Sequence, residues 1–237
     1  MKVTIITKLN FNDMIENLNE IIGDIRSRYE LKRISSYLQP DKYDTANSLF
    51  ASMASAICGK DYDCRNTASI INKLVHWTYN TSVDDIDCTK GFLIRGETGR
   101  GKTLLMYAMK EFLQYDSHWY IVGGKRYRLE MSIASARNIA FEYAQQSEEN
   151  VIARYSRIPL LCIDDLGSEP MLSSNYGNKC SVVSEILANR AETKLLTFAT
   201  TNVARLSECY DDRIISRMHS LFNSVNLSHE TDYRKLK

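Results

Sequence analysis

Apolar residues recur at helical spacing along the N-terminal third of the 237-residue chain. The stripes predict three helices, at residues 11–25, 49–57 and 70–77. Pro40 separates the first helix from the second, and Gly59 is placed to end the second. This region is small for an independent core, so we expect it to pack on the rest of the chain or on a partner.

The pattern changes after a polar stretch at residues 81–90. Strands and helices then alternate, which favours an α/β domain with a parallel sheet. The expected elements are strands at 92–94, 160–163 and 195–199, helices at 102–113, 149–155, 182–190 and 212–219, a helix capped by Ser135, and a hairpin of 118–122 with 127–133 around Gly123-Gly124. We therefore divide the chain into a helical N-terminal, partner-binding region, 1–83, and an α/β domain, 84–237.

Composition and charge narrow the functional classes only slightly. The formal net charge is +1, so a nucleic-acid site would have to be a local patch. The six cysteines form no C-x-x-C pair, which is typical of free thiols in a reducing compartment. No segment approaches the ~20 apolar residues that span a membrane, and no signal peptide is evident. We expect a cytoplasmic protein.

One motif carries specific chemistry. Residues 96–103 fit the phosphate-loop pattern G-x-x-x-x-G-K-[ST] at every fixed position, between a predicted strand and a predicted helix. The residues expected to bind ATP are Gly96, Glu97, Thr98, Gly99, Arg100, Gly101, Lys102 and Thr103. Lys102 is expected to reach the β- and γ-phosphates, and the Thr103 hydroxyl to ligate Mg²⁺.

A second apolar run, beginning at Pro159, ends in two carboxylates, Asp164 and Asp165. The carboxyl end of a parallel strand is where ligands bind in open α/β folds. Asp164 is therefore placed to hold Mg²⁺ through water, and Asp165 to orient or deprotonate the attacking water. Alone, the pair would indicate a solvated turn; after a complete phosphate loop, the catalytic interpretation is favoured.

Two further features leave alternatives open. Asn202 ends another apolar strand, where it could contact the γ-phosphate or the attacking water, or simply terminate the strand. Arg213 and Arg217 lie four residues apart on one predicted helix face. They could form surface ion pairs, or one could be an arginine finger for a neighbouring subunit.

The order of these motifs resembles the AAA+ superfamily, and most of all its DnaC/DnaI/IstB branch of helicase loaders and transposition helper ATPases. The resemblance covers about residues 86–236 and is carried by Ile163–Glu169, Tyr176–Asn178, Thr200–Asn202 and Tyr210–Met218. It implies a P-loop NTPase fold of the AAA+ type: a doubly wound parallel sheet after a small helical segment, without a full C-terminal lid.

The resemblance also implies roles for single residues. Asp164 matches the Walker B magnesium residue, and Asp165 stands where most AAA+ proteins have a catalytic Glu. Asn202 matches sensor 1, and Arg217 matches the arginine finger. Arg234 resembles the terminal arginine that loaders often keep. Hydrolysis of ATP is expected to be slow in isolation, because a monomer lacks its neighbour's arginine.

The helices between Ser135 and Tyr155 resemble the insert that lines a single-stranded DNA channel in the initiator and loader clade. Arg137, Arg154 and Arg157 would suit that role, or they could be surface charges.

Three functions follow from this resemblance. The first is an ATP-dependent loader that binds a hexameric replicative DNA helicase and single-stranded DNA, and assembles into a homo-oligomer through its ATP sites. The alternative is an IstB-like transposition helper ATPase that assembles on double-stranded DNA. The third is a nucleotide-gated adaptor with negligible turnover.

Overall fold

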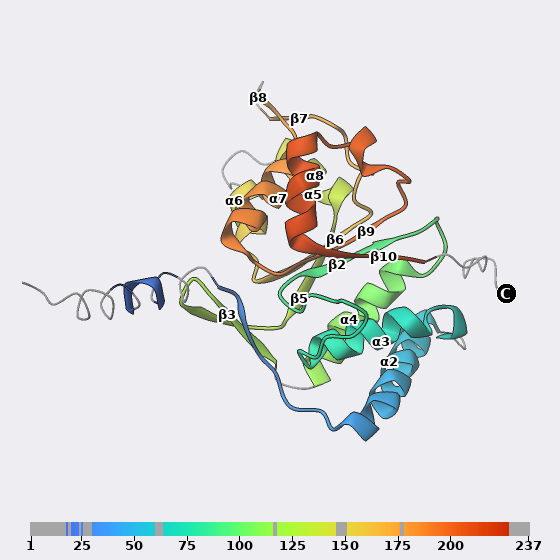
Figure 1. Ribbon diagram of the computed structural model, residues 1–237. Coiled ribbons are helices and arrows are strands. Elements are labelled where there is room, and N and C mark those ends of the chain that lie inside the picture. Colours follow the sequence, from blue (N-terminus) through green and yellow to red (C-terminus); the bar gives the residue numbers. More distant parts are fainter. Residues whose placement is uncertain are drawn as a thin grey trace, which may run out of the picture.

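A five-stranded parallel sheet forms the centre of the molecule (Figure 1). The computed structural model describes residues 18, 20–23, 25, 30–59, 64–115, 118–145, 151–175 and 178–227. The strands lie in the order β10 (Phe222–Asn226), β2 (Gly91–Arg95), β9 (Thr197–Thr201), β6 (Leu160–Asp164) and β5 (Met131–Ser135). Because every pair is parallel, the carboxyl ends of all these strands meet at one edge.

Helices cover both faces of this sheet, as the sequence predicted (Figure 1). One face carries α2 (Tyr43–Cys58), α3 (Ala68–Thr78) and α4 (Lys102–Tyr115), and the other carries α5 (Ala136–Gln145), α6 (Val151–Arg157), α7 (Val182–Thr193) and α8 (Asp212–Leu221). Strand β2 shows how the layers share side chains: Phe92 and Ile94 enter the core under α4, whereas Leu93 enters the opposite core. The fold is thus a doubly wound α/β sandwich.

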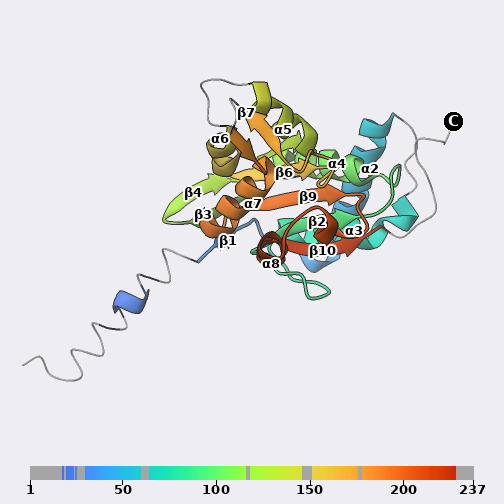
Figure 2. The same ribbon diagram turned by 90° about the horizontal axis from the view of Figure 1, so that it is seen from above.

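A small antiparallel sheet extends the molecule at one end (Figure 2). It contains β1 (Lys32–Ile34), β3 (Trp119–Val122) and β4 (Lys125–Arg128). The predicted hairpin around Gly123-Gly124 is confirmed, but its second strand ends at Arg128. The prediction was wrong for residues 129–133, because the buried Leu129 turns the chain so that β5 joins the parallel sheet.

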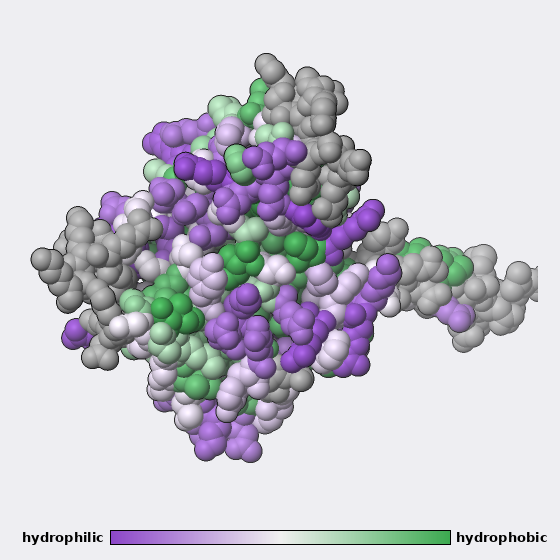
Figure 3. All heavy atoms as spheres, turned by 180° about the vertical axis from the view of Figure 1, so that it is seen from behind, coloured by the Kyte–Doolittle hydropathy of each residue, from purple (hydrophilic) through white to green (hydrophobic). Residues whose placement is uncertain are grey.

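Short elements complete the chain. Strands β7 (Ser173–Asn175) and β8 (Asn178–Cys180) pair in a second hairpin. Single 3₁₀ turns lie at η1 (Pro40–Lys42), η2 (Cys64–Asn66) and η3 (Leu206–Glu208). Along the part of the chain that the structure describes, no helix is both long and apolar enough to cross a membrane. Figure 3 shows one face, on which polar residues surround small apolar patches.

The N-terminal region is only partly helical. Helices α2 and α3 confirm two predicted helices, and α2 ends at Gly59, whose left-handed backbone (φ 69°) lets its N–H bond to the Ser55 carbonyl. The helix predicted at 11–25 lies largely outside the described residues. Strand β1, however, was not predicted, because three residues with two charges carry no clear alternation.

This region shares its core with the α/β domain. The ring of Phe50 on α2 lies 5.4 Å from that of Phe112 on α4, and the ring of Trp77 on α3 lies 5.0 Å from that of Phe198 on β9. Arg33 of β1 stacks on Trp77, with its guanidinium carbon 3.9 Å from the ring centre. The division at residue 83 therefore stays a prediction about function, since the described residues on both sides form one hydrophobic core.

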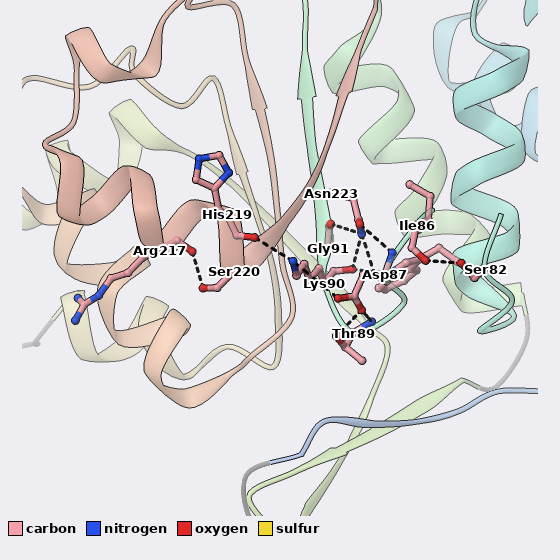
Figure 4. A network of polar contacts seen from close by, with 11 residues as sticks. Ser82, Ile86, Asp87, Thr89, Lys90, Gly91, Arg217, His219, Ser220 and Asn223 are labelled. Carbon is pink, nitrogen blue, oxygen red and sulfur yellow. Dashed lines mark hydrogen bonds and ion pairs between the residues drawn. The ribbon is translucent and has the colours of Figure 1, made fainter. Parts of the chain in front are cut away.

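The connection before β2 is held by polar contacts (Figure 4). The side-chain amide of Asn223 donates to the carbonyls of Asp87 and Gly91, and its oxygen accepts from the Asp87 N–H. Lys90 reaches the His219 carbonyl at the end of α8, at 3.1 Å. These contacts fix the end of α8 and the start of β10 against the strand that leads into the phosphate loop.

Candidate active site

The loop at residues 96–103 leaves β2 and opens α4, at the carboxyl edge of the sheet. Gly99 and Gly101 have positive φ angles of 84° and 87°, which side-chain-bearing residues rarely adopt. A Cβ on Gly96 would lie 2.8 Å from the Leu227 carbonyl oxygen, so this position excludes larger residues. The tight turn and the close backbone approach explain why glycine occurs at these positions.

Lys102 lies beneath this loop and is only 5% exposed. Its ammonium donates to the carbonyls of Gly96 and Glu97, both at 2.8 Å. Arg100 and Glu97 form an ion pair across the loop. The loop thus holds a buried ammonium, whose positive charge also lowers the pKa of the nearby Asp164.

Thr103 and Asp164 meet between the loop and β6. The Thr103 hydroxyl donates to the Asp164 carboxylate at 2.9 Å, and the Thr200 hydroxyl from β9 donates to it at 2.6 Å. Burial raises the pKa of Asp164, although these two hydrogen bonds oppose the rise. A hydroxyl and a carboxylate are oxygen donors of the type that Mg²⁺ prefers, so the pair fits this ion.

Asp165 adopts an uncommon backbone conformation, with φ 56°. Its N–H donates to the Thr200 hydroxyl at 2.9 Å, and the Leu166 N–H donates to the Thr200 carbonyl at 2.8 Å. These bonds hold the turn after β6 against the end of β9. Non-glycine residues with a positive φ often occur at functional sites, where surrounding contacts maintain the strained backbone.

Asn202 follows β9 and reaches the phosphate loop. Its side-chain amide donates to the Thr98 hydroxyl at 3.2 Å. Lys102, Thr103, Asp165 and Asn202 all line one pocket of about 320 Å³. Residues predicted from three separate motifs are thus brought together at the carboxyl edge of the sheet.

Two contributors to this site were not predicted. Cys58, at the end of α2, lines the same pocket, so the N-terminal region also reaches the site. Thr200 bonds to both Asp164 and Asp165, although its residue type alone gave no reason to single it out. Only the pairing of β6 with β9 places its hydroxyl between the Asp164 carboxylate and the Asp165 N–H.

The turn after Asp165 is tied to the segment before α8. The Gly167 N–H and the Tyr210 hydroxyl both donate to the Glu169 carboxylate. Burial and the nearby Glu169 raise the pKa of Tyr210, so its hydroxyl stays protonated and acts as a donor. Glu169 and Tyr210, which belong to the segments carrying the family resemblance, therefore form one structural unit.

Arg217 lies on α8, across the sheet from α4. Its guanidinium forms an ion pair with Glu192 of α7, at 2.9 Å, and Arg213 is exposed. Figure 4 shows the Arg217 side chain extending away from α8. The structure thus places Arg217 apart from the phosphate loop of its own chain. Tyr176, Gly177 and Arg234 lie outside the described residues.

The basic residues predicted on the two-helix insert differ in their contacts. Arg154 of α6 forms an ion pair with Glu142 of α5 and holds the two helices together. Arg137 and Arg157 are exposed. The Ser135 hydroxyl accepts from the Asn138 N–H, which confirms the predicted cap of α5.

The strand order, the loop after β2 and the carboxylates after β6 define an α/β core of the P-loop AAA+ type. Three solved structures share this core. DnaI is 20% identical with a TM-score of 0.51, over 70% of this chain and 87% of that one. The DnaC helicase loader is 17% identical with a TM-score of 0.51, over 68% and 90%.

The third is a candidate primosome component from Streptococcus pyogenes serotype M3, 18% identical with a TM-score of 0.50, over 69% of this chain and 80% of that one. No protein-family model matches the sequence, and no curated protein does. At these identities the likeness establishes the fold.

Proposed function

We propose that the protein binds ATP with Mg²⁺ and hydrolyses it to ADP and phosphate. The observation that carries this proposal is the direct contact between Thr103 and Asp164, beside the buried ammonium of Lys102. The loop N–H groups and Lys102 would hold the phosphates, and Thr103 and Asp164, the latter through water, would hold Mg²⁺. Mg²⁺, when bound, neutralises charge on the β- and γ-phosphates.

Two residues are proposed to act on the attacking water and the γ-phosphate. Asp165 lines the pocket and is fixed by its backbone bond to Thr200, so its carboxylate is positioned to orient the water. Asn202 already contacts Thr98 of the loop, which supports a role near the γ-phosphate. A nucleotide-gated adaptor with negligible turnover, the third function considered, would have no use for Asp165 and Asn202 in these positions.

Arg217 is proposed to complete a neighbouring subunit's site. Its position across the sheet from α4, together with its ion pair to the exposed Glu192, suits a residue that acts in another chain. Assembly through the ATP sites would then be needed for full turnover, and the isolated chain would be slow.

We further propose that the ATPase serves as a helicase loader, with a hexameric replicative helicase and single-stranded DNA as partners. The shared fold with DnaI and the DnaC helicase loader supports this. The full chain should co-elute with such a helicase in size-exclusion chromatography and should favour single-stranded over duplex DNA. Co-elution with a transposase, or a preference for duplex DNA, would instead support the transposition helper.

Two substitutions test the ATPase itself. Lys102→Ala should lower kcat/KM for ATP at least about a hundredfold, because a preorganised cation beside the phosphates is lost. Lys110→Ala, on the same helix, is the matched control and should behave like the wild type. Nucleotide affinity is measured by calorimetry and turnover by phosphate release.

Arg217→Ala should keep ATP affinity but reduce DNA-stimulated turnover by about 10³-fold or more. Its folding stability should change by no more than about 1 kcal/mol, because the ion pair with Glu192 is exposed. Arg213→Ala is the control. Loss of ATP affinity in Arg217→Ala would show that this arginine acts within its own chain.

A further inference from the structure

The small sheet β1-β3-β4 has one face turned toward the core and one turned away from it. In the observed register, Arg33, Tyr120 and Tyr127 form a row on the inner face, where Arg33 and Tyr120 are buried. Because successive side chains alternate, the neighbouring rows point outward. The outer face consists of Lys32, Ile34, Trp119, Ile121, Arg126 and Arg128.

This outer face is open to solvent as far as the described residues extend. Lys32, Arg126 and Arg128 are exposed, and Ile34 is 37% exposed. Trp119 is half-buried in the middle of the face. Three cations and a large aromatic ring therefore share one surface, which we call the basic sheet face.

The charges on this face are only partly balanced. Arg128 forms an exposed ion pair with Glu130, at 3.2 Å. The guanidinium carbon of Arg126 lies 4.4 Å from the centre of the Trp119 ring, so Arg126 stacks on the aromatic ring. Since the whole chain has a net charge of only +1, three cations on one small sheet are a local concentration of positive charge.

A basic groove continues on the other side of the hairpin. A cavity of about 470 Å³ lies between the hairpin and the ends of α6 and α7, and three cations, Lys125, Arg157 and Lys194, line it together with one acidic residue, Glu192. The three cations are exposed. The hairpin is therefore bordered by cations on both sides, which gives an extended polyanion more contacts than the outer face alone.

We propose that the basic sheet face binds single-stranded nucleic acid. Lys32, Arg126 and Arg128 would contact phosphates, and a base would stack on the Trp119–Arg126 pair. The bases of a duplex are already stacked on one another, so duplex nucleic acid is disfavoured as a ligand. A peptide of acidic residues is disfavoured too, because it has no flat ring to stack on this pair. This deepens the proposed role with single-stranded DNA by naming its surface, but the contact needs neither ATP nor assembly.

The test uses the full chain without nucleotide and an oligothymidylate of about 20 nucleotides, longer than the ~4–16 nucleotides that such sites cover. Fluorescence anisotropy is measured over a salt series. The double variant Arg126→Ala/Arg128→Ala should bind at least about tenfold more weakly. Its slope of log K against log salt should also be about 1.4 shallower, because each of the two lost phosphate contacts contributes ~0.7 to the slope. Lys42→Ala/Lys73→Ala, which removes the same charge elsewhere, should match the wild type.

Intrinsic fluorescence tests the stacking directly. Trp77 is fully buried, so quenching by the oligonucleotide should come from Trp119. Trp119→Leu should lose the quenching and weaken binding about 5- to 150-fold, the range expected for one stacked base, whereas Trp119→Phe should retain most of the affinity. Quenching by polyglutamate as strong as that by the oligonucleotide would overturn the proposal.

An unchanged salt slope in the double variant, or equal weakening in the lysine control, would also overturn it. Lys102→Ala separates the two proposals, because it should abolish turnover and leave oligonucleotide binding without nucleotide intact. If the wild type hydrolyses ATP but the double variant binds DNA normally, only the basic sheet face is refuted. If DNA binding follows these predictions but no hydrolysis occurs, only the ATPase is refuted.

Discussion

Each edge of the parallel sheet holds a charged side chain, and the two edges use these charges differently. At the carboxyl edge, Asp164 accepts from the hydroxyls of Thr103 and Thr200 beside the pocket. At the amino edge, Arg190 of α7 is fully buried and donates to the carbonyls of Ile158 and Leu196 and to other nearby oxygens. We call the first the open edge, because its charge lies beside a pocket that could hold a ligand, and the second the closed edge, because its charge is enclosed by backbone carbonyls.

The partners explain the difference. Carbonyl oxygens are fixed by the fold, so Arg190 joins the segments before β6 and β9 permanently. Burial lowers the pKa of Arg190 to about 10, which leaves it charged at neutral pH. Hydroxyl groups can rotate and change partners, so Asp164 can exchange a threonine for a ligand without breaking the sheet. A partly buried charge held by hydroxyls is therefore the better indicator of a functional site.

The largest effect should come from the closed edge. Arg190→Met leaves several buried carbonyls without donors and should lower the free energy of unfolding by about 3–5 kcal/mol. Arg213→Met, on the exposed surface of α8, should change it by less than about 0.5 kcal/mol. Urea denaturation measures both. If Arg190→Met is as stable as the control, the amino edge does not depend on this charge.

A smaller effect on stability, with the opposite sign, is expected at the open edge. Asp164 has a raised pKa in the folded state, so its contribution to stability is full below the ordinary value of 3.8 and is lost as the pH rises through the folded pKa. Asp164→Asn should therefore unfold at higher urea than the wild type near neutral pH. The two proteins should converge as the pH falls toward 4.

The same substitution should reduce ATP turnover by about 10²–10³-fold, because it removes the charge that we propose to hold Mg²⁺. A variant that is more stable but inactive would show that this edge is built for function at the expense of stability. Lower stability at neutral pH would instead mean that the carboxylate holds the fold together.

Most of the open edge could be predicted because its residues lie in short, contiguous motifs. The phosphate loop and the Asp164-Asp165 pair each follow an apolar strand, and a parallel sheet gathers such strand ends. Asn202 was open to two interpretations, and its contact with Thr98 favours the functional one. The position of Arg217 beside Glu192 could not be predicted, because it depends on how α7 and α8 pack.

Strand β10 and the closed edge could not be predicted for a physical reason. Strand β10 was missed because five residues of mixed polarity become a strand only by pairing with β2, far away in sequence. Arg190 lies in a regular helix, where an arginine normally faces solvent. Its burial depends on the segments before β6 and β9, which local periodicity does not reveal.

The smallest expected effect concerns Thr200, the residue that joins the Asp164 carboxylate to the Asp165 backbone. Its hydroxyl donates to Asp164 and accepts from the Asp165 N–H, so Thr200→Val removes both hydrogen bonds. We expect a loss of about 1–2 kcal/mol in the free energy of unfolding. Thr200→Ser keeps the hydroxyl and should lose less.

The pH dependence distinguishes a lost hydrogen bond from a packing defect. The bond from Thr200 opposes the rise in the pKa of Asp164, so Thr200→Val should raise this pKa further. The hydrogen bond favours the charged carboxylate, which is present above the folded pKa; the stability lost in Thr200→Val should therefore be larger near neutral pH than in acid. An equal loss at neutral and acidic pH, or the same loss in Thr200→Ser, would mean that Thr200 matters for its shape and not for its hydrogen bonds to Asp164 and Asp165.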